Sequence, residues 1–179
     1  PSWVNFLSSE KIPEHKIIHA QIFESQKDGI FLTSQQFGVS FDYDDFPSDF
    51  IFETKTRYSD SHLVKIKVMR PDGITLELLS TSLPYSEINT IHEQRYFSTD
   101  NMIKKNLNVY KNDFQFDFLR GSSEIIFSQL DDNKIQKGDY VFIIDTYGID
   151  ESAEIIESKM ILGGKAFGLM GTDELRRDL

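Results

Sequence analysis

Apolar and polar residues alternate along most of the chain, which is the pattern of β-strands that bury one face. Clusters of Gly, Pro, Asp, Asn and Ser separate the alternating segments, as expected of turns. The alternation predicts strands at 17–23, 30–32, 37–43, 50–56, 140–146 and 154–162. A turn at Lys27-Asp28-Gly29 follows the first of them, and residues 148–150 predict the connection that joins the last two as a pair.

The segment from Leu63 to Leu79 predicts a β-hairpin. Every second residue is apolar on both sides of Arg70-Pro71-Asp72-Gly73. Proline fixes φ, aspartate hydrogen-bonds its own backbone and glycine accepts positive φ, so each residue type suits a tight turn.

Two further segments have helical features. Ser98-Thr99-Asp100 supplies an N-cap for a short helix in which Ile103, Leu107 and Tyr110 recur at helical spacing. The apolar residues of 122–130 fit a short helix or a strand, and their pattern leaves both open.

The predicted fold class is mainly β. Many short strands with regular turn signals indicate an antiparallel β-sandwich or a distorted barrel, with one or two short helices and the start of a helix at the C-terminus. Aromatic residues gather on one face of two alternating segments, and we interpret both rows as core, with a ligand groove as the alternative. The rows are Phe37, Phe41 and Tyr43, and Phe114, Phe116 and Phe118.

Composition narrows the function classes. The 179 residues suit one domain, and 29 acidic against 19 basic side chains give a net charge of −10. Because this charge repels phosphates, we expect no nucleic-acid partner. The lack of cysteine excludes disulfides, thiol nucleophiles and sulfur-ligated zinc, and no apolar run has the length of a membrane span.

The densest group of carboxylates lies at Asp42, Asp44, Asp45 and Asp49. Its spacing approaches that of a calcium-binding loop, but Pro47 occupies the position that such a loop gives to glycine. We interpret the segment as a solvated acidic turn, with a non-helical calcium site as the alternative. No metal site is otherwise predicted.

Two other groups of polar residues are weaker candidates. His15 and His19 share a face on a strand, but about 13 Å apart, which is too far for one metal ion. Residues 145–154 carry Asp145, Asp150, Glu151 and Glu154, which predict either a second acidic patch or a charged rim that discourages edge pairing.

Motifs of catalysis are absent from the sequence. It has no Gly-x-Ser-x-Gly, no His-Glu-x-x-His and no glycine-rich phosphate loop. His62 and His92 have no serine and aspartate nearby in the order of a triad. We therefore predict no catalytic residue, no enzyme and no cofactor.

The C-terminal segment carries a resemblance to a known family. Gly171, Thr172, Asp173, Arg177 and Asp178 resemble the Gly-Thr-Asp-x-x-Gly-Arg-Asp motif of the permease subunits of dipeptide and oligopeptide ABC importers. Arg176 departs from it, because the family has glycine there.

The resemblance implies a layout in three parts. Residues 1–9 would follow a membrane helix, with Trp3 as an anchor at the membrane interface or packed under the sandwich. Residues 10–163 would be an extracytoplasmic β-sandwich at the cell membrane, and residues 164–179 would lead to the next membrane helix. Implied partners are a solute-binding protein that docks on this domain, a second permease subunit, cytoplasmic ATPase subunits and the membrane. The alternative is an independent surface β-sandwich that binds carbohydrate or calcium.

Overall fold

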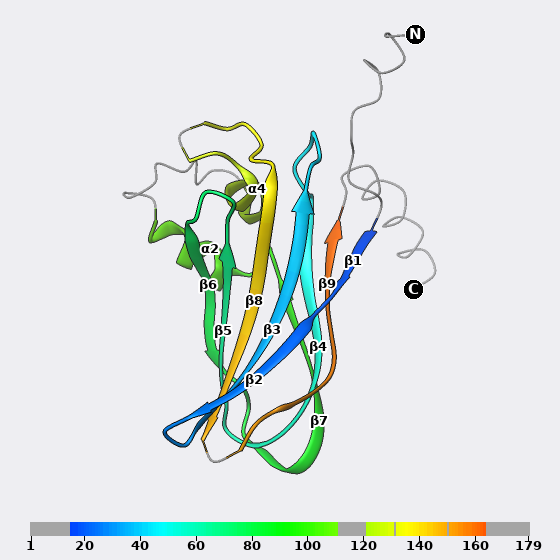
Figure 1. Ribbon diagram of the computed structural model, residues 1–179, viewed down its shortest axis with the longest axis vertical. Helices are drawn as coiled ribbons and strands as arrows, with labels where there is room; N and C mark the ends of the chain where they lie inside the picture. Colours follow the sequence, from blue (N-terminus) through cyan, green and yellow to red (C-terminus); the bar gives the residue numbers. More distant parts are fainter. Residues whose placement is uncertain (1–14, 111–120, 131, 150, 164–179) are drawn as a thin grey trace.

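The computed structural model describes residues 15–110, 121–130, 132–149 and 151–163, and they form an antiparallel β-sandwich (Figure 1). One sheet has four strands in the order β1-β9-β4-β7, and the other has five in the order β2-β3-β8-β5-β6. The four strands are β1 (His15–His19), β9 (Glu154–Gly163), β4 (Asp49–Asp60) and β7 (Ser86–Phe97). The five are β2 (Gln21–Lys27), β3 (Ile30–Phe41), β8 (Gly138–Ile149), β5 (Leu63–Met69) and β6 (Thr75–Ser82).

Aromatic side chains join the two sheets. The ring of Phe37 on β3 lies 5.4 Å from that of Phe52 on β4, and Phe142 on β8 lies 5.5 Å from Phe50. All four side chains are fully buried. Of the predicted row, Phe41 is also buried and Tyr43 packs partly buried against the core, so the prediction that this row belongs to the core is confirmed. Aromatic pairs at these separations add to the stability that burial itself provides.

The predicted turns at 27–29 and 70–73 are present. Asp28 and Gly29 have φ values of 52° and 76°, which is the left-handed geometry of a two-residue turn that matches the twist of β2 and β3. Gly73 has a φ of 83°, and the backbone N–H of Ile74 donates to Oδ1 of Asp72 at 3.1 Å. The hairpin of β5 and β6 is therefore confirmed with the turn chemistry that the sequence indicates.

Two short helices lie toward one end of the sandwich, and the β2–β3 turn lies at the other (Figure 1). They are α2 (Asn101–Asn108) and α4 (Ser122–Phe127). Asp100 is the N-cap residue of α2, and the predicted Ile103 and Leu107 are its buried residues. The segment that the sequence leaves open between helix and strand begins as helix α4, in which five of the six residues are buried.

Arg70 fixes the C-terminal end of α4. Its guanidinium is fully buried and donates to the backbone carbonyls of Ile126 and Ser128, each at 2.8 Å. It also pairs with Asp72 at 2.8 Å, so the turn of the β5–β6 hairpin and the end of the helix share one anchor.

Several predicted strand boundaries are wrong. The segment 17–23 is not one strand: it divides at Ala20 into β1 and β2, which belong to different sheets. The backbone N–H of Ala20 donates to the carbonyl of Ser158, which marks the crossing from one layer to the other. Alternation alone cannot detect this, because the pattern continues through the crossing.

Three further predictions differ from the structure, and they concern β3, β7 and the pairing of β8 with β9. Segments 30–32 and 37–43 are not two strands: residues 30–41 form one strand, β3, which ends before Tyr43, and its interior Gln35 is buried and bonds to Ser158. β7 was not predicted, because this edge strand carries many polar residues on its exposed face. β8 and β9 do not pair with each other but lie in opposite sheets.

Candidate functional site

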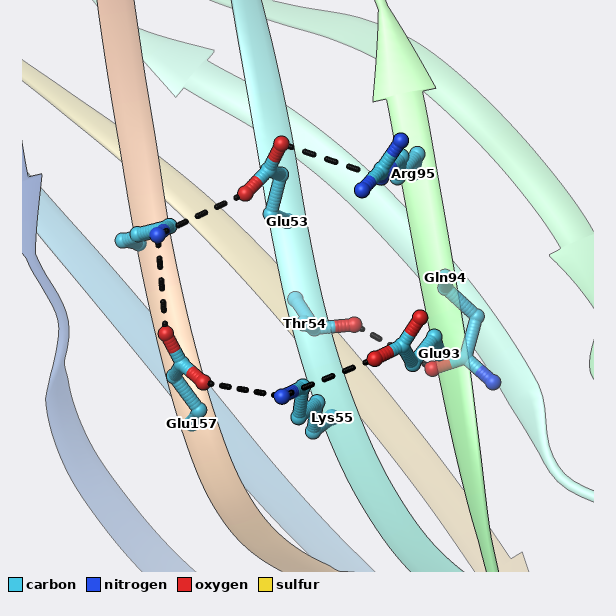
Figure 2. Close-up of a pocket in the computed structure, with 8 residues that line it drawn as sticks. Glu53, Thr54, Lys55, Glu93, Gln94, Arg95 and Glu157 are labelled. Carbon is cyan, nitrogen blue, oxygen red and sulfur yellow. Dashed lines mark hydrogen bonds and ion pairs between the residues drawn. The ribbon is translucent and has the colours of Figure 1, made fainter.

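Six charged side chains cover the outer face of the four-stranded sheet, and we call them the charge lattice (Figure 2). They alternate in sign both along and across the strands: Glu53 and Lys55 on β4, Glu93 and Arg95 on β7, Glu157 and Lys159 on β9. Lys55 lies 3.5 Å from both Glu93 and Glu157, and Glu53 lies 3.7 Å from Arg95 and 3.5 Å from Lys159.

Each charge of the lattice meets an opposite charge. The carboxylate of Glu157 raises the pKa of Lys55, with a smaller contribution from Glu93, and Lys55 in turn lowers the pKa of Glu157. Three acids and three bases sum to zero, so the lattice balances itself on a chain that carries −10. The hollow between these side chains measures about 130 Å³.

A larger hollow lies on the outer face of the five-stranded sheet, at the end away from the helices. We call it the groove, and it has a volume of about 510 Å³. Its lining comprises Ile30, Ser61, His62, Leu63, Lys65, Ser82, Tyr147, Gly148 and Ile149. Ile30 and Ile149 are 48% and 73% exposed, so apolar surface faces solvent here.

Strand register builds the floor of the groove. Tyr147 on β8 stands directly between Leu32 on β3 and Leu63 on β5. Burial raises the pKa of Tyr147, and the charge of Asp145 raises it further while that of Lys67 opposes the shift. The phenol therefore keeps its proton at neutral pH and both donates and accepts hydrogen bonds.

A polar row lies two residues further along the same three strands. Ser34, Asp145 and Lys65 stand side by side across β3, β8 and β5. The side chain of Asp145 is only 8% exposed, and its Oδ2 lies 3.5 Å from Nζ of Lys67. An aromatic and aliphatic floor thus borders directly on hydroxyl, carboxylate and ammonium groups.

His62 closes one side of the groove and is only 3% exposed. Neither of its ring nitrogens makes a hydrogen bond of good geometry within the described chain, although the backbone carbonyl of Glu151 faces the ring. Burial lowers the pKa of His62, while that carbonyl and the charges of Glu151 and Asp60 oppose the shift. The imidazole is therefore held neutral beside the groove.

The four carboxylates of the acidic turn do not converge on a single point. Nζ of Lys137 lies 2.7 Å from Asp44 and 3.6 Å from Asp42, which places a cation of the chain itself between them. Asp45 accepts the backbone N–H of Phe46, and Asp49 accepts the hydroxyl of Ser48. Among the residues that the structure describes, no group of three or more His, Asp or Glu could hold a metal ion.

The other weak candidates are dispersed. His15 and His19 lie at opposite ends of β1, paired in register with Gly163 and Lys159. Glu154 pairs with Arg57 at 3.1 Å, whereas Asp145 belongs to the polar row of the other sheet. The predicted second acidic patch is therefore wrong as far as Asp145 is concerned.

Several sequence-based candidates fall outside the described residues. They are Trp3, the second aromatic row, Asp150 and the motif residues Gly171, Thr172, Asp173, Arg177 and Asp178. The residues of the groove were not singled out from sequence. Tyr147 and Leu63 lie in alternating segments, but their meeting depends on the pairing of β8 with β5, which are far apart in the chain.

Comparisons with known proteins give matches to solved structures alone. No family model and no curated protein matches the chain. The carbohydrate-binding module TmCBM61, solved with β-1,4-galactotriose, is 11% identical with a TM-score of 0.33, covering 88% of this chain and 89% of its own. A CBM4 structure is 6% identical with a TM-score of 0.29, covering 84% of this chain and 86% of its own.

A third structure, from a study of carbohydrate-binding modules of the β-sandwich superfamily, is 6% identical with a TM-score of 0.30. The match covers 88% of this chain and 60% of the other.

Among the described residues, no helix is long and apolar enough to cross a membrane.

These comparisons correct the assignment to peptide transport by an ABC importer permease. The similar structures named above are carbohydrate-binding modules, and none of them is a permease. The short motif matches that produced the assignment cover few residues of the chain, and those residues lie outside the described structure. The partners and the location that the resemblance implies stay predictions.

Proposed function

We propose that this domain binds a saccharide in the groove of the five-stranded sheet. The observation that carries the proposal is the apolar lining of the groove, in which the half-buried Tyr147 lies beside the exposed Leu63, Ile30 and Ile149 and is bordered by polar side chains. The similarity to carbohydrate-binding modules says what those proteins bind and not what this chain binds. The proposal for this chain therefore rests on the groove.

The chemistry of the groove matches the two surfaces of a sugar ring. A pyranose presents C–H groups on its faces and hydroxyls around its edge, so it suits an aromatic floor with donors and acceptors beside it. Tyr147 supplies the floor, and Ser61, Ser82 and Lys65 supply polar groups at its border. Few polar groups on an apolar surface are the usual composition of a ligand site.

Replacement of Tyr147 by alanine tests the proposal. The variant keeps the pairing of β8 but loses the ring, so we expect binding to weaken about tenfold or more, in the range of a lost stacking contact. Affinity electrophoresis against a panel of soluble polysaccharides identifies the ligand, and isothermal titration calorimetry of the best ligand measures the loss.

The matched control is Phe97→Ala. Phe97 is an exposed aromatic residue on β7, at the other sheet, and we expect its removal to leave binding unchanged. Binding that survives Tyr147→Ala but not Phe97→Ala would move the site to the opposite face. Failure of every polysaccharide in the panel to retard the domain would refute the function.

A further inference from the structure

The groove carries a single formal charge among its described lining residues. That charge is the ammonium of Lys65, since His62 is neutral by burial and the other seven residues are uncharged. The chain as a whole carries a net charge of −10, so most of its surface is expected to be negative. The lining of the groove is instead positive.

Lys65 is also unpaired within the described chain, where no acidic group lies within ion-pair distance of it. Asp145 stands across from it in register, but its carboxylate is buried and pairs with Lys67 at 3.5 Å. The three side chains Lys65, Lys67 and Asp145 together leave one positive charge. By contrast, every cation of the charge lattice has a carboxylate partner.

We propose that the groove selects an acidic saccharide, with an anionic substituent of the sugar bound by Lys65. The proposal rests on the function proposed above and names its substrate class. Lys65 lies two residues along β5 from Leu63, the neighbour of Tyr147, which is a distance of about 7 Å. A ring on Tyr147 therefore brings a carboxylate or sulfate of the same or the next unit to the ammonium.

The ammonium of Lys65 forms no ion pair in the described structure, so it is available to a ligand. An exposed ammonium without a partner gains little from folding, whereas a ligand anion would form a charge-assisted hydrogen bond with it. Burial of the neighbouring Leu63 and Tyr147 under a sugar would exclude water and strengthen that bond.

Calorimetry with matched ligands tests the inference. The probes are a trigalacturonate, the neutral galactotriose of the same linkage and a sulfated galactotriose. We expect the unmodified domain to bind an acidic probe at least fivefold more tightly than the neutral one, and Lys65→Met to abolish that preference. Salt should weaken acidic binding to the unmodified domain but leave the Lys65→Met variant little changed.

Lys104→Met is the control, because it removes one exposed lysine of α2 that pairs with no acid in the described chain. It changes the net charge equally, and we expect the preference for the acidic probe to persist. Preference for trigalacturonate or for the sulfated probe supports the inference and identifies the anion. Equal binding of acidic and neutral probes, with a loss on Tyr147→Ala, overturns the inference and keeps the proposed function. If no saccharide binds, both are overturned.

Discussion

The outer faces of the two sheets use charge in opposite ways. On the four-stranded sheet, Lys55 bridges Glu93 and Glu157, and the six charges of the lattice cancel. On the five-stranded sheet, the groove offers apolar side chains and one uncompensated ammonium, that of Lys65. Both faces consist of antiparallel strands with outward side chains, so the difference lies in the residues and not in the fold.

This difference supports the proposal that the groove, and not the charge lattice, receives a ligand. A molecule that settled on the charge lattice would have to desolvate six ions that already satisfy one another, and this costs more than it returns. A molecule in the groove would cover exposed apolar surface and meet the polar groups at its border. The groove is also larger, about 510 Å³ against about 130 Å³.

Gly148→Ala should have the largest effect on the groove. It alters the packing at one end and replaces none of the side chains that line it. A Cβ at this position would clash with Nε2 of His62 and with the backbone carbonyl of Glu151. We expect a loss of about 1–3 kcal/mol in the free energy of unfolding, as for an overpacked site, together with weaker saccharide binding. Chemical denaturation and calorimetry measure the two effects.

Gly38→Ala is the matched control on the outer face of the same sheet. Nothing lies within 4 Å of a Cβ added there, so stability and binding should both remain close to those of the unmodified domain. An equal effect of the two substitutions would mean that β8 has no special packing at the end of the groove.

The neutral His62 gives the groove a pH dependence close to neutral pH, whereas the shifted pKa values of the lattice, those of Lys55 and Glu157, act in the alkaline and acid ranges. Its folded pKa lies below the unfolded value of 6.5, so the unfolded chain binds the proton first as pH falls. The free energy of unfolding should therefore decrease below about pH 6.5, by at most about 1.4 kcal/mol per pH unit from this group. Denaturation between about pH 7.5 and about pH 5 measures the slope.

His62→Gln removes the titrating group and should make that slope shallower. Asp60 and Glu151 are the charges that act on the ring, Tyr58 packs against it at 5.2 Å between ring centroids, and the ring of His92 lies 4.7 Å from that of Tyr58. His92→Gln should retain most of the slope. If His62→Gln left the slope unchanged and His92→Gln reduced it, the pH dependence would come from His92 and the prediction would be wrong.

The sequence predicted what depends on near neighbours in the chain. The β5–β6 hairpin, the Asp28-Gly29 turn and helix α2 each follow from local spacing and turn chemistry, and all are present. The groove depends on which strands become neighbours: Tyr147 meets Leu63 through the pairing of β8 with β5. Alternation shows that Tyr147 shares a face with Asp145, but it does not show which strand lies beside them.

Lys55→Met is the mildest perturbation and tests whether the lattice serves stability alone. It removes the cation between Glu93 and Glu157, although Glu157 keeps Lys159 at 3.5 Å. Because these side chains are exposed, we expect only a slightly lower midpoint of unfolding at low salt, and the difference should shrink at about 1 M salt as screening weakens the repulsion between the two carboxylates. Saccharide affinity should be unchanged, since the groove lies on the other sheet. A loss of binding that matches that of Tyr147→Ala would show that the charged face, and not the groove, receives the ligand.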